Sequence, residues 1–116
     1  MKIEERTVGG VTILDLKGRL TLGDGDALLK DKIHSLLHQG RKSFLLNLGD
    51  VPYIDSAGIG EIVGTYTTVN RQGGSLKLLN LTKRIHDLLV ITKLLTVFET
   101  FSAEAEAVRS FSSPVA

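Results

Sequence analysis

The stretch YIDSAGIGEIVG, from Tyr53 to Gly64, joins the end of an apolar run to a glycine-rich segment with helical spacing. Asp55 and Ser56 stand at the junction between the two. Each glycine inside a helix costs about 0.5–1 kcal/mol relative to alanine, so Gly60 and Gly64 call for a reason other than helix stability. Because they are four residues apart, they share one face of the helix, beside its apolar stripe. A smooth face of this kind favours either tight packing on a neighbouring element or the close approach of another protein.

Strand and helix patterns alternate on both sides of this stretch. Two β-branched runs, residues 2–8 and 11–18, are joined by Gly9-Gly10, which suits a tight hairpin turn with positive φ. Apolar residues at helical spacing predict four helices: 27–39, 56–72, 83–94 and 103–111. Short apolar runs predict three more strands: 42–48, 75–81 and 96–101. Strands separated by helices imply parallel pairing. The sequence therefore predicts an α/β fold with a mixed, mostly parallel sheet, an N-terminal antiparallel hairpin and about four helices, in a single domain over residues 1–116.

Polar residues at the predicted helix starts are candidate caps, since their side chains can accept hydrogen bonds from unpaired backbone N–H groups. Asp24 or Asp26 can cap the first helix, and Ser56 the second. Thr82 and Ser102 can cap the third and the fourth.

The composition excludes several classes of protein. A chain of 116 residues, 42% hydrophobic with two prolines, suits one compact domain. There is no cysteine, and the three histidines form no ligand cluster, so we expect neither a metal nor a cofactor. A net charge of +1 without a basic block gives no indication of nucleic-acid binding. Neither a signal peptide nor a run of about 20 apolar residues is present, so we expect a cytoplasmic domain that does not enter a membrane.

Catalytic interpretations of the central stretch are weak. Gly58, Gly60 and Gly64 approach a dinucleotide-binding fingerprint, but the turn follows the third strand and lacks an acidic residue about 20 positions on. Ser56 lacks the G-x-S-x-G context and the positioned base of a hydrolase nucleophile. We therefore expect no catalytic residue and no enzyme. A small anion or nucleotide phosphate bound at the helix start, Ser56–Gly60, remains open as an alternative.

The chain resembles the bacterial anti-sigma factor antagonists, which are built as a STAS domain. The residues that carry the resemblance are VPYIDSAGIGEIVGTY (51–66), the preceding LLNLGD (45–50) and the following GGSLKLLNLTKRIHDLLVITKLLTVFE (73–99). The most specific part is Asp-Ser-x-Gly-aliphatic-Gly between strand and helix. The resemblance covers nearly the whole chain, including the order of its elements.

This resemblance implies a non-enzymatic switch. In such proteins an anti-sigma factor that is also a serine kinase binds the unphosphorylated antagonist and is released when it phosphorylates the serine after the aspartate. A PP2C-type phosphatase restores the free hydroxyl. Carried over, the phosphoacceptor is Ser56, and the partner-binding residues are Asp55, Ser56, Ala57, Gly58, Ile59, Gly60, Glu61 and Gly64, with Thr21 and Asp24. The oligomeric state stays open, as does service in a lipid-transport or sensory assembly, where other STAS domains work.

The sequence departs from this family at the end of the second strand. Many members carry an aspartate there, in a Gly-x-Leu-Asp pattern, whereas this chain has Gly18-Arg19-Leu20-Thr21. Threonine offers a neutral hydroxyl in place of a carboxylate. Asp24 and Asp26 are the next carboxylates along the chain. We expect phosphorylation at Ser56 nonetheless, because Asp55, Ser56, Gly58 and Gly60 are all present.

Overall fold

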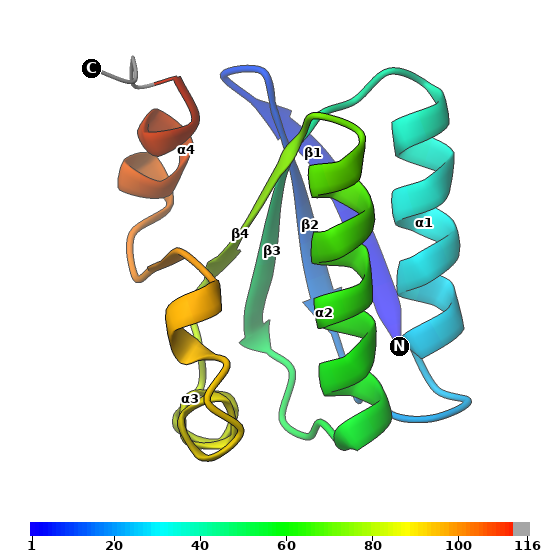
Figure 1. Ribbon diagram of the computed structural model, residues 1–116, viewed down its shortest axis with the longest axis vertical. Coiled ribbons are helices and arrows are strands. Elements are labelled where there is room, and N and C mark those ends of the chain that lie inside the picture. The colour runs from blue at the N-terminus through cyan, green and yellow to red at the C-terminus, as the bar shows by residue number, and fades with distance from the viewer. Residues whose placement is uncertain (113–116) are drawn as a thin grey trace.

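A five-stranded sheet runs through the computed structural model, which describes residues 1–112 (Figure 1). Its strands lie side by side in chain order: β1 (Lys2–Val8), β2 (Val11–Lys17), β3 (Ser43–Asp50), β4 (Ser75–Leu79) and β5 (Thr100–Phe101). β1 and β2 are antiparallel, and the other neighbours are parallel. The predicted mixed, mostly parallel sheet is therefore confirmed. The prediction of a single domain over residues 1–116 includes residues 113–116, which lie outside the residues that the structure describes.

The hairpin between β1 and β2 turns at the predicted glycines. Gly9 and Gly10 have φ values of 56° and 80°, and Val8 pairs with Val11 across the turn. Two consecutive residues with positive φ define the type of tight turn that follows the twist of the strands. Only glycine adopts this backbone without strain at both positions.

Four α-helices within residues 1–112 cover the two faces of the sheet: α1 (Asp26–His38), α2 (Ser56–Arg71), α3 (Lys83–Ile91) and α4 (Glu104–Ser112). The first three pack on one face, and α4 packs alone on the other (Figure 1). Strands β2 to β5 follow one another across the sheet, so all three parallel crossovers place their helix on the same side. No helix in this part of the chain is long and apolar enough to cross a bilayer.

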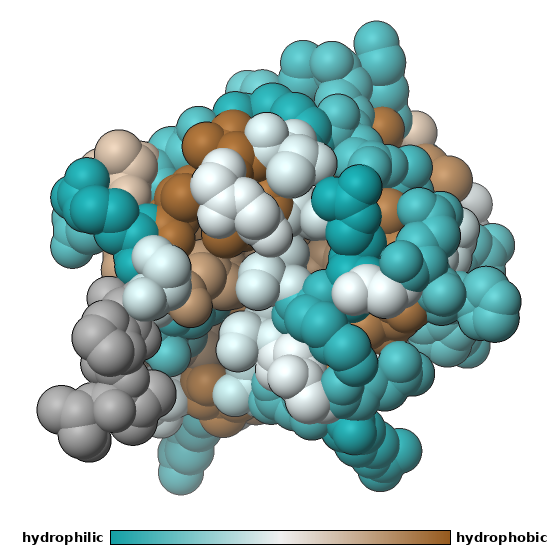
Figure 2. All heavy atoms as spheres, turned by 90° about the horizontal axis from the view of Figure 1, so that it is seen from above, coloured by the Kyte–Doolittle hydropathy of each residue, from teal (hydrophilic) through white to brown (hydrophobic). Residues whose placement is uncertain are grey.

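The core is continuous on the face covered by α1 to α3 and smaller beneath α4. Successive residues of β3 serve the two sides: Phe44 and Leu46 belong to the larger cluster, and Leu45 to the smaller one with Ala107 of α4. All four are fully buried. A strand buried on both faces explains why the apolar run in β3 is continuous and not alternating. Seen from the end that carries the hairpin turn, hydrophilic residues occupy most of the rim, and hydrophobic residues show as patches beside a central zone of intermediate hydropathy (Figure 2).

Outside α2, one of the predicted helix caps is confirmed. Thr82 caps α3, since its hydroxyl accepts from Ile85 N at 3.2 Å. The predicted Asp24 or Asp26 cap of α1 is wrong, because Gly25 occupies the N-cap position and no side chain caps the helix. The φ of Gly25 is 107°, a backbone conformation that would be strained in a residue with a side chain. The predicted Ser102 cap is also wrong: the carbonyl of Ala103 accepts the first bond of α4, from Ala107 N at 3.0 Å.

The last predicted strand, 96–101, is mostly a different structure. Leu95–Val97 form a 3₁₀ turn, and only Thr100–Phe101 pair with β4. The turn carries the chain inward, so that Phe98 is 5% exposed and meets the ring of Tyr66 edge-on, with centroids 4.9 Å apart. Burial of this ring takes precedence over the strand propensity of the run.

Arg6 links β1, β2 and the first turn of α4. Its guanidinium donates to both carboxylate oxygens of Asp15, at 2.6 and 3.1 Å, and to Glu104 at 3.0 Å. Asp15 also accepts from the Asn47 amide at 2.8 Å. Hydrogen bonds from Arg6 hold the pKa values of both carboxyl groups below their ordinary values. The helix on the minor face is thus attached partly through an ion-pair network, which depends on both carboxylates being charged.

Arg6→Gln is expected to lower stability near neutral pH and to flatten its dependence on acid. Because the two folded-state pKa values are lowered, their stabilisation is complete above about pH 4.5, the ordinary carboxyl range, and disappears as pH falls through the lower values. Urea unfolding at a series of pH values measures the slope. Arg41→Gln is the matched control, since the Arg41 guanidinium hydrogen-bonds the hydroxyls of Thr7 and Thr12 and forms no ion pair with any residue in the described range 1–112. An Arg6 variant that retains the wild-type slope would contradict this assignment.

Candidate functional site

Two loops are joined at the carboxyl end of the sheet, where α2 begins (Figure 1). One follows β2 and the other follows β3. Leu20 N donates to Tyr53 O at 3.0 Å, and Asp55 N approaches Leu20 O at 3.4 Å. This short parallel bridge extends the β2–β3 pairing into the loops. The segment around Thr21 is thereby brought beside the Asp55-Ser56 pair, although more than thirty residues separate them in sequence.

The Asp55 carboxylate connects these loops to α2. One oxygen accepts from Gly58 N at 2.9 Å and caps the helix, and the other accepts from Leu22 N at 3.1 Å. The pKa of Asp55 is accordingly lowered, first by the bond from Gly58 and then by that from Leu22. A carboxylate in this position remains charged at neutral pH and holds the two loops together.

Ser56 is not the N-cap that its position suggested. Asp55 takes that role, and Ser56 is the first residue of α2. The serine is exposed, and within residues 1–112 no group of the chain hydrogen-bonds its hydroxyl. The Asp55 carboxylate and the Ser56 hydroxyl therefore have different roles. The carboxylate fixes the structure, and the hydroxyl remains free at the surface.

The three glycines of α2 have different surroundings. A Cβ atom on Gly58 would lie 2.1 Å from Leu20 O and 2.6 Å from Ile54 Cγ1, so this position requires glycine for the close approach of the two loops. A Cβ atom on Gly60 would meet nothing within 4 Å, and one on Gly64 only the Glu61 carboxylate at 3.9 Å. Tight packing within the domain thus explains Gly58 and leaves Gly60 and Gly64 unexplained.

Gly60 and Gly64 line an open groove of about 480 Å³ between α1 and α2. The other lining residues are Lys30, His34, Ala57, Glu61, Thr65 and Thr68. Partial burial raises the pKa of Glu61. The groove therefore combines two positions without side chains, Gly60 and Gly64, with ionisable groups from both helices. Of the residues predicted to bind a partner, Ala57, Gly60, Glu61 and Gly64 gather here, whereas Gly58 and Ile59 are buried.

The loop after β2 places an exposed residue, Leu22, beside the predicted site, and the sequence did not indicate it. Thr21 and Asp24 close a tight turn through reciprocal backbone bonds of 2.9 and 3.0 Å. Thr21 is buried, and the Asp24 carboxylate accepts from the Met1 amino group at 3.1 Å. The tip of the turn is Leu22, which is 76% exposed. A single leucine among loop residues forms no period, so its exposure beside Asp55 could be found only from the fold.

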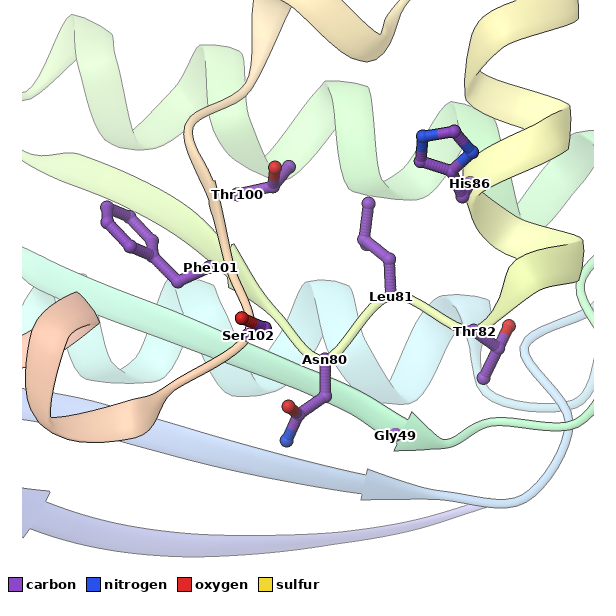
Figure 3. Close-up of a pocket in the computed structure, with 8 residues that line it drawn as sticks. All are labelled: Gly49, Asn80, Leu81, Thr82, His86, Thr100, Phe101 and Ser102. Carbon is purple, nitrogen blue, oxygen red and sulfur yellow. The ribbon is translucent and has the colours of Figure 1, made fainter.

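A second hollow of about 530 Å³ opens at the same end of the sheet, between the connections that follow β4 and β5 (Figure 3). Its lining residues are Gly49, Asn80, Leu81, Thr82, His86, Thr100, Phe101 and Ser102. The side chains of Asn80 and Leu81 point in opposite directions (Figure 3), and the Asn80 amide donates to Asn47 Oδ1 at 3.2 Å. None of the predicted site residues lies here. Small-molecule sites usually have convergent polar groups, whereas here the Asn80 amide is bound to Asn47 and the Thr82 hydroxyl caps α3. No group of three metal-binding side chains occurs within residues 1–112.

Comparisons with known proteins agree with this architecture. Residues 2–107 match the family model of the STAS domain. The anti-sigma-B factor antagonist of Bacillus subtilis is 43% identical over 79 residues, which are 68% of this chain and 71% of the relative. The anti-sigma F factor antagonist of Paenibacillus polymyxa is 25% identical over 107 residues, 92% of each chain. The Bacillus protein SpoIIAA, solved unphosphorylated and phosphorylated, shares the fold at 19% identity. The TM-scores are 0.73 for the unphosphorylated form and 0.74 for the phosphorylated form. The two superpositions cover 97% and 94% of this chain and 100% and 98% of SpoIIAA.

Gly58→Ala and Gly60→Ala are expected to shift stability in opposite directions, although they lie two residues apart on one helix. The methyl group at position 58 collides with the Leu20 carbonyl, and overpacking of this kind costs about 1–3 kcal/mol. The methyl group at position 60 enters open space, and alanine in a helix stabilises by about 0.5–1 kcal/mol relative to glycine. Thermal unfolding followed by circular dichroism compares the two. Equal destabilisation by both substitutions would mean that Gly60 is packed as well.

Proposed function

The chain belongs to the STAS domain family, in which the anti-sigma factor antagonists are non-enzymatic regulators, and from that premise we propose that it binds an anti-sigma factor and is released by phosphorylation of Ser56. The observation that carries this proposal is the free, exposed hydroxyl of Ser56 beside a carboxylate that is already engaged. The anti-sigma factor would itself be the serine kinase, and a PP2C-type phosphatase would remove the phosphate. With such partners, the protein would act in the cytoplasm.

The site suits a kinase substrate because its hydroxyl is accessible and held in a fixed position. Ser56 begins a helix that is capped by Asp55 and packed through Gly58, so its Cα is held by the backbone on both sides. Among residues 1–112 the hydroxyl makes no hydrogen bond that would have to be broken before it attacks a phosphoryl donor. Positioning of the acceptor is the main contribution that a substrate can make to phosphoryl transfer.

Phosphorylation would change the surface more than the fold. A phosphoserine adds about −1.5 to −2 charges and three acceptor oxygens. The first turn of a helix tolerates this charge because its backbone N–H groups and dipole favour anions. Inside a protein–protein interface the same phosphate must be desolvated next to the Asp55 carboxylate, which is costly. SpoIIAA, which exists in both forms, resembles this chain equally in each, in keeping with a switch that leaves the fold intact.

The groove between α1 and α2 is the proposed docking surface for the kinase. Gly60 and Gly64 allow a partner to approach the helix backbone, and Ala57 continues this surface towards Ser56. Leu22 adds an exposed apolar side chain on the other side of Asp55. Thr21 is buried in the position where many family members carry an aspartate, so we propose that recognition here depends on the groove and not on a carboxylate at position 21.

Ser56 is expected to be the principal phosphoacceptor, and its substitution should separate binding from release. Ser56→Ala keeps the surface neutral and should bind the cognate kinase, whereas Ser56→Asp should bind more weakly by a few kcal/mol. Mass spectrometry after incubation with kinase and ATP locates the phosphate, and titration calorimetry compares the variants. Modification chiefly at Ser75 or Ser102, or equal affinity of the two variants, would refute the proposal.

Thr21→Asp tests the missing carboxylate, and its phosphorylation rate with the cognate kinase is compared with that of the wild type. We expect the wild type to be phosphorylated. A wild type that is not phosphorylated, beside a variant that is, would mean that this chain binds the kinase but has lost the switch.

Gly64→Leu is expected to weaken the complex while it leaves the melting temperature unchanged or higher. Leucine is the better helix former, and the side chain would extend into the open groove. Thr67→Leu is the matched control, because Thr67 is exposed on the same helix and does not line the groove. Affinity and melting temperature are measured for both. If both variants bind the kinase as the wild type does, the groove is not the docking surface.

A further inference from the structure

Arg19, Tyr53 and Arg84 come together from three separate segments at the carboxyl end of the sheet. Arg19 follows β2, Tyr53 lies in the loop before α2, and Arg84 belongs to the first turn of α3. The guanidinium carbons of Arg19 and Arg84 lie 5.1 and 4.4 Å from the centroid of the Tyr53 ring. Both contacts are within the range in which a cation is attracted to an aromatic face.

Neither of these guanidinium groups is neutralised by the chain itself. Within residues 1–112 they have no ion pair and no hydrogen bond, and both arginines are exposed. Their neighbours differ in this respect. Lys83 pairs with Asp87 at 2.8 Å, and Lys17 pairs with Glu4 at 2.8 Å. The surface around Tyr53 therefore carries two uncompensated positive charges in a chain whose net charge is only +1.

Contact with one ring holds the two cations ready for an anion. The N–H donors of both guanidinium groups make no hydrogen bond within residues 1–112, and a carboxylate can accept two such donors in parallel. The side chains are partly ordered by the ring, so less conformational entropy is lost on binding. Two positive charges beside one ring also repel each other, and an acidic group placed between them relieves this repulsion.

The position of this group connects it to the switch. Tyr53 is three residues before Ser56, and its carbonyl accepts from Leu20 N, next to Arg19, at 3.0 Å. A protein that docks on Ser56 would cover part of the same surface, and an arginine buried there without a counter-ion would weaken the complex. A partner with negative charge opposite Tyr53 would avoid this cost.

We propose that Arg19, Tyr53 and Arg84 form a cationic docking point for carboxylate side chains of the anti-sigma factor. This inference rests on the proposed function and adds the chemistry of the contacting surface. Nucleic acid does not fit the site, because two charges without a wider basic stripe give too small an electrostatic footprint.

The double variant Arg19→Gln/Arg84→Gln tests the proposal by titration calorimetry against the cognate anti-sigma factor, purified from the same organism, at low and high salt. We expect affinity to fall roughly tenfold at low salt, and its salt dependence to become weaker than that of the wild type. Lys83→Gln is the matched control, since it removes a neighbouring charge that Asp87 already neutralises; it should bind as the wild type does.

Three outcomes distinguish this inference from the proposed function. If the double variant binds as tightly as the wild type while Ser56→Asp binds more weakly, the docking point is wrong and the switch stands. If the double variant only melts at a lower temperature, with affinity and salt dependence unchanged, the arginines merely brace the loop and the inference is overturned. A wild type that binds no anti-sigma factor would overturn both.

Discussion

Two backbone N–H groups, one from each of two chain segments, donate to the single carboxylate of Asp55. The bond from Gly58 fixes the first turn of α2, and the bond from Leu22 fixes the loop after β2. The absence of a side chain on Gly58 lets that turn approach the Leu20 carbonyl. Because Asp55 satisfies both loops, the neighbouring serine is not needed to hold the structure. The free hydroxyl of Ser56 is thus a consequence of how its neighbour is bonded, and its availability for modification depends on that arrangement.

The layered fold keeps this surface separate from the elements that stabilise the domain. The large core lies between the sheet and α1 to α3, and the small one beneath α4 is supplemented by the Arg6 network. The site occupies the carboxyl end of the parallel strands, where loops from several strands converge. A partner can therefore gain or lose contacts there without access to either core. The exposed Leu22 and the cationic group around Tyr53 lie at this end, and the open groove runs from it along α1 and α2. Together they make up the proposed docking surface.

Periodicity predicted the order of the elements and the sheet because these depend on local spacing and on burial. The Gly9-Gly10 turn and the continuous apolar run of β3 are examples. The capping residue of α2 could not be chosen from sequence, since aspartate and serine are comparable caps; the choice depends on an amide 33 residues away. Likewise, only the three-dimensional neighbours separate packed Gly58 from the two glycines that face open space. The end of the sheet was mispredicted because burial of Phe98 turns the chain where strand propensity is high.

The central claim is that Asp55 already fixes the first turn of α2 and the loop after β2 before Ser56 is modified. A phosphate on Ser56 would then alter the surface and leave the fold unchanged. Amide hydrogen exchange, compared residue by residue between the unmodified chain and one carrying phosphoserine at position 56, measures this directly. The account predicts equal protection throughout β2 to β4 and α2, with the Gly58 amide remaining as protected as before and Leu22 changed at most slightly. Loss of protection through the first turn of α2 and the loop after β2 would contradict it, because the switch would then be a local unfolding and not a change of surface charge.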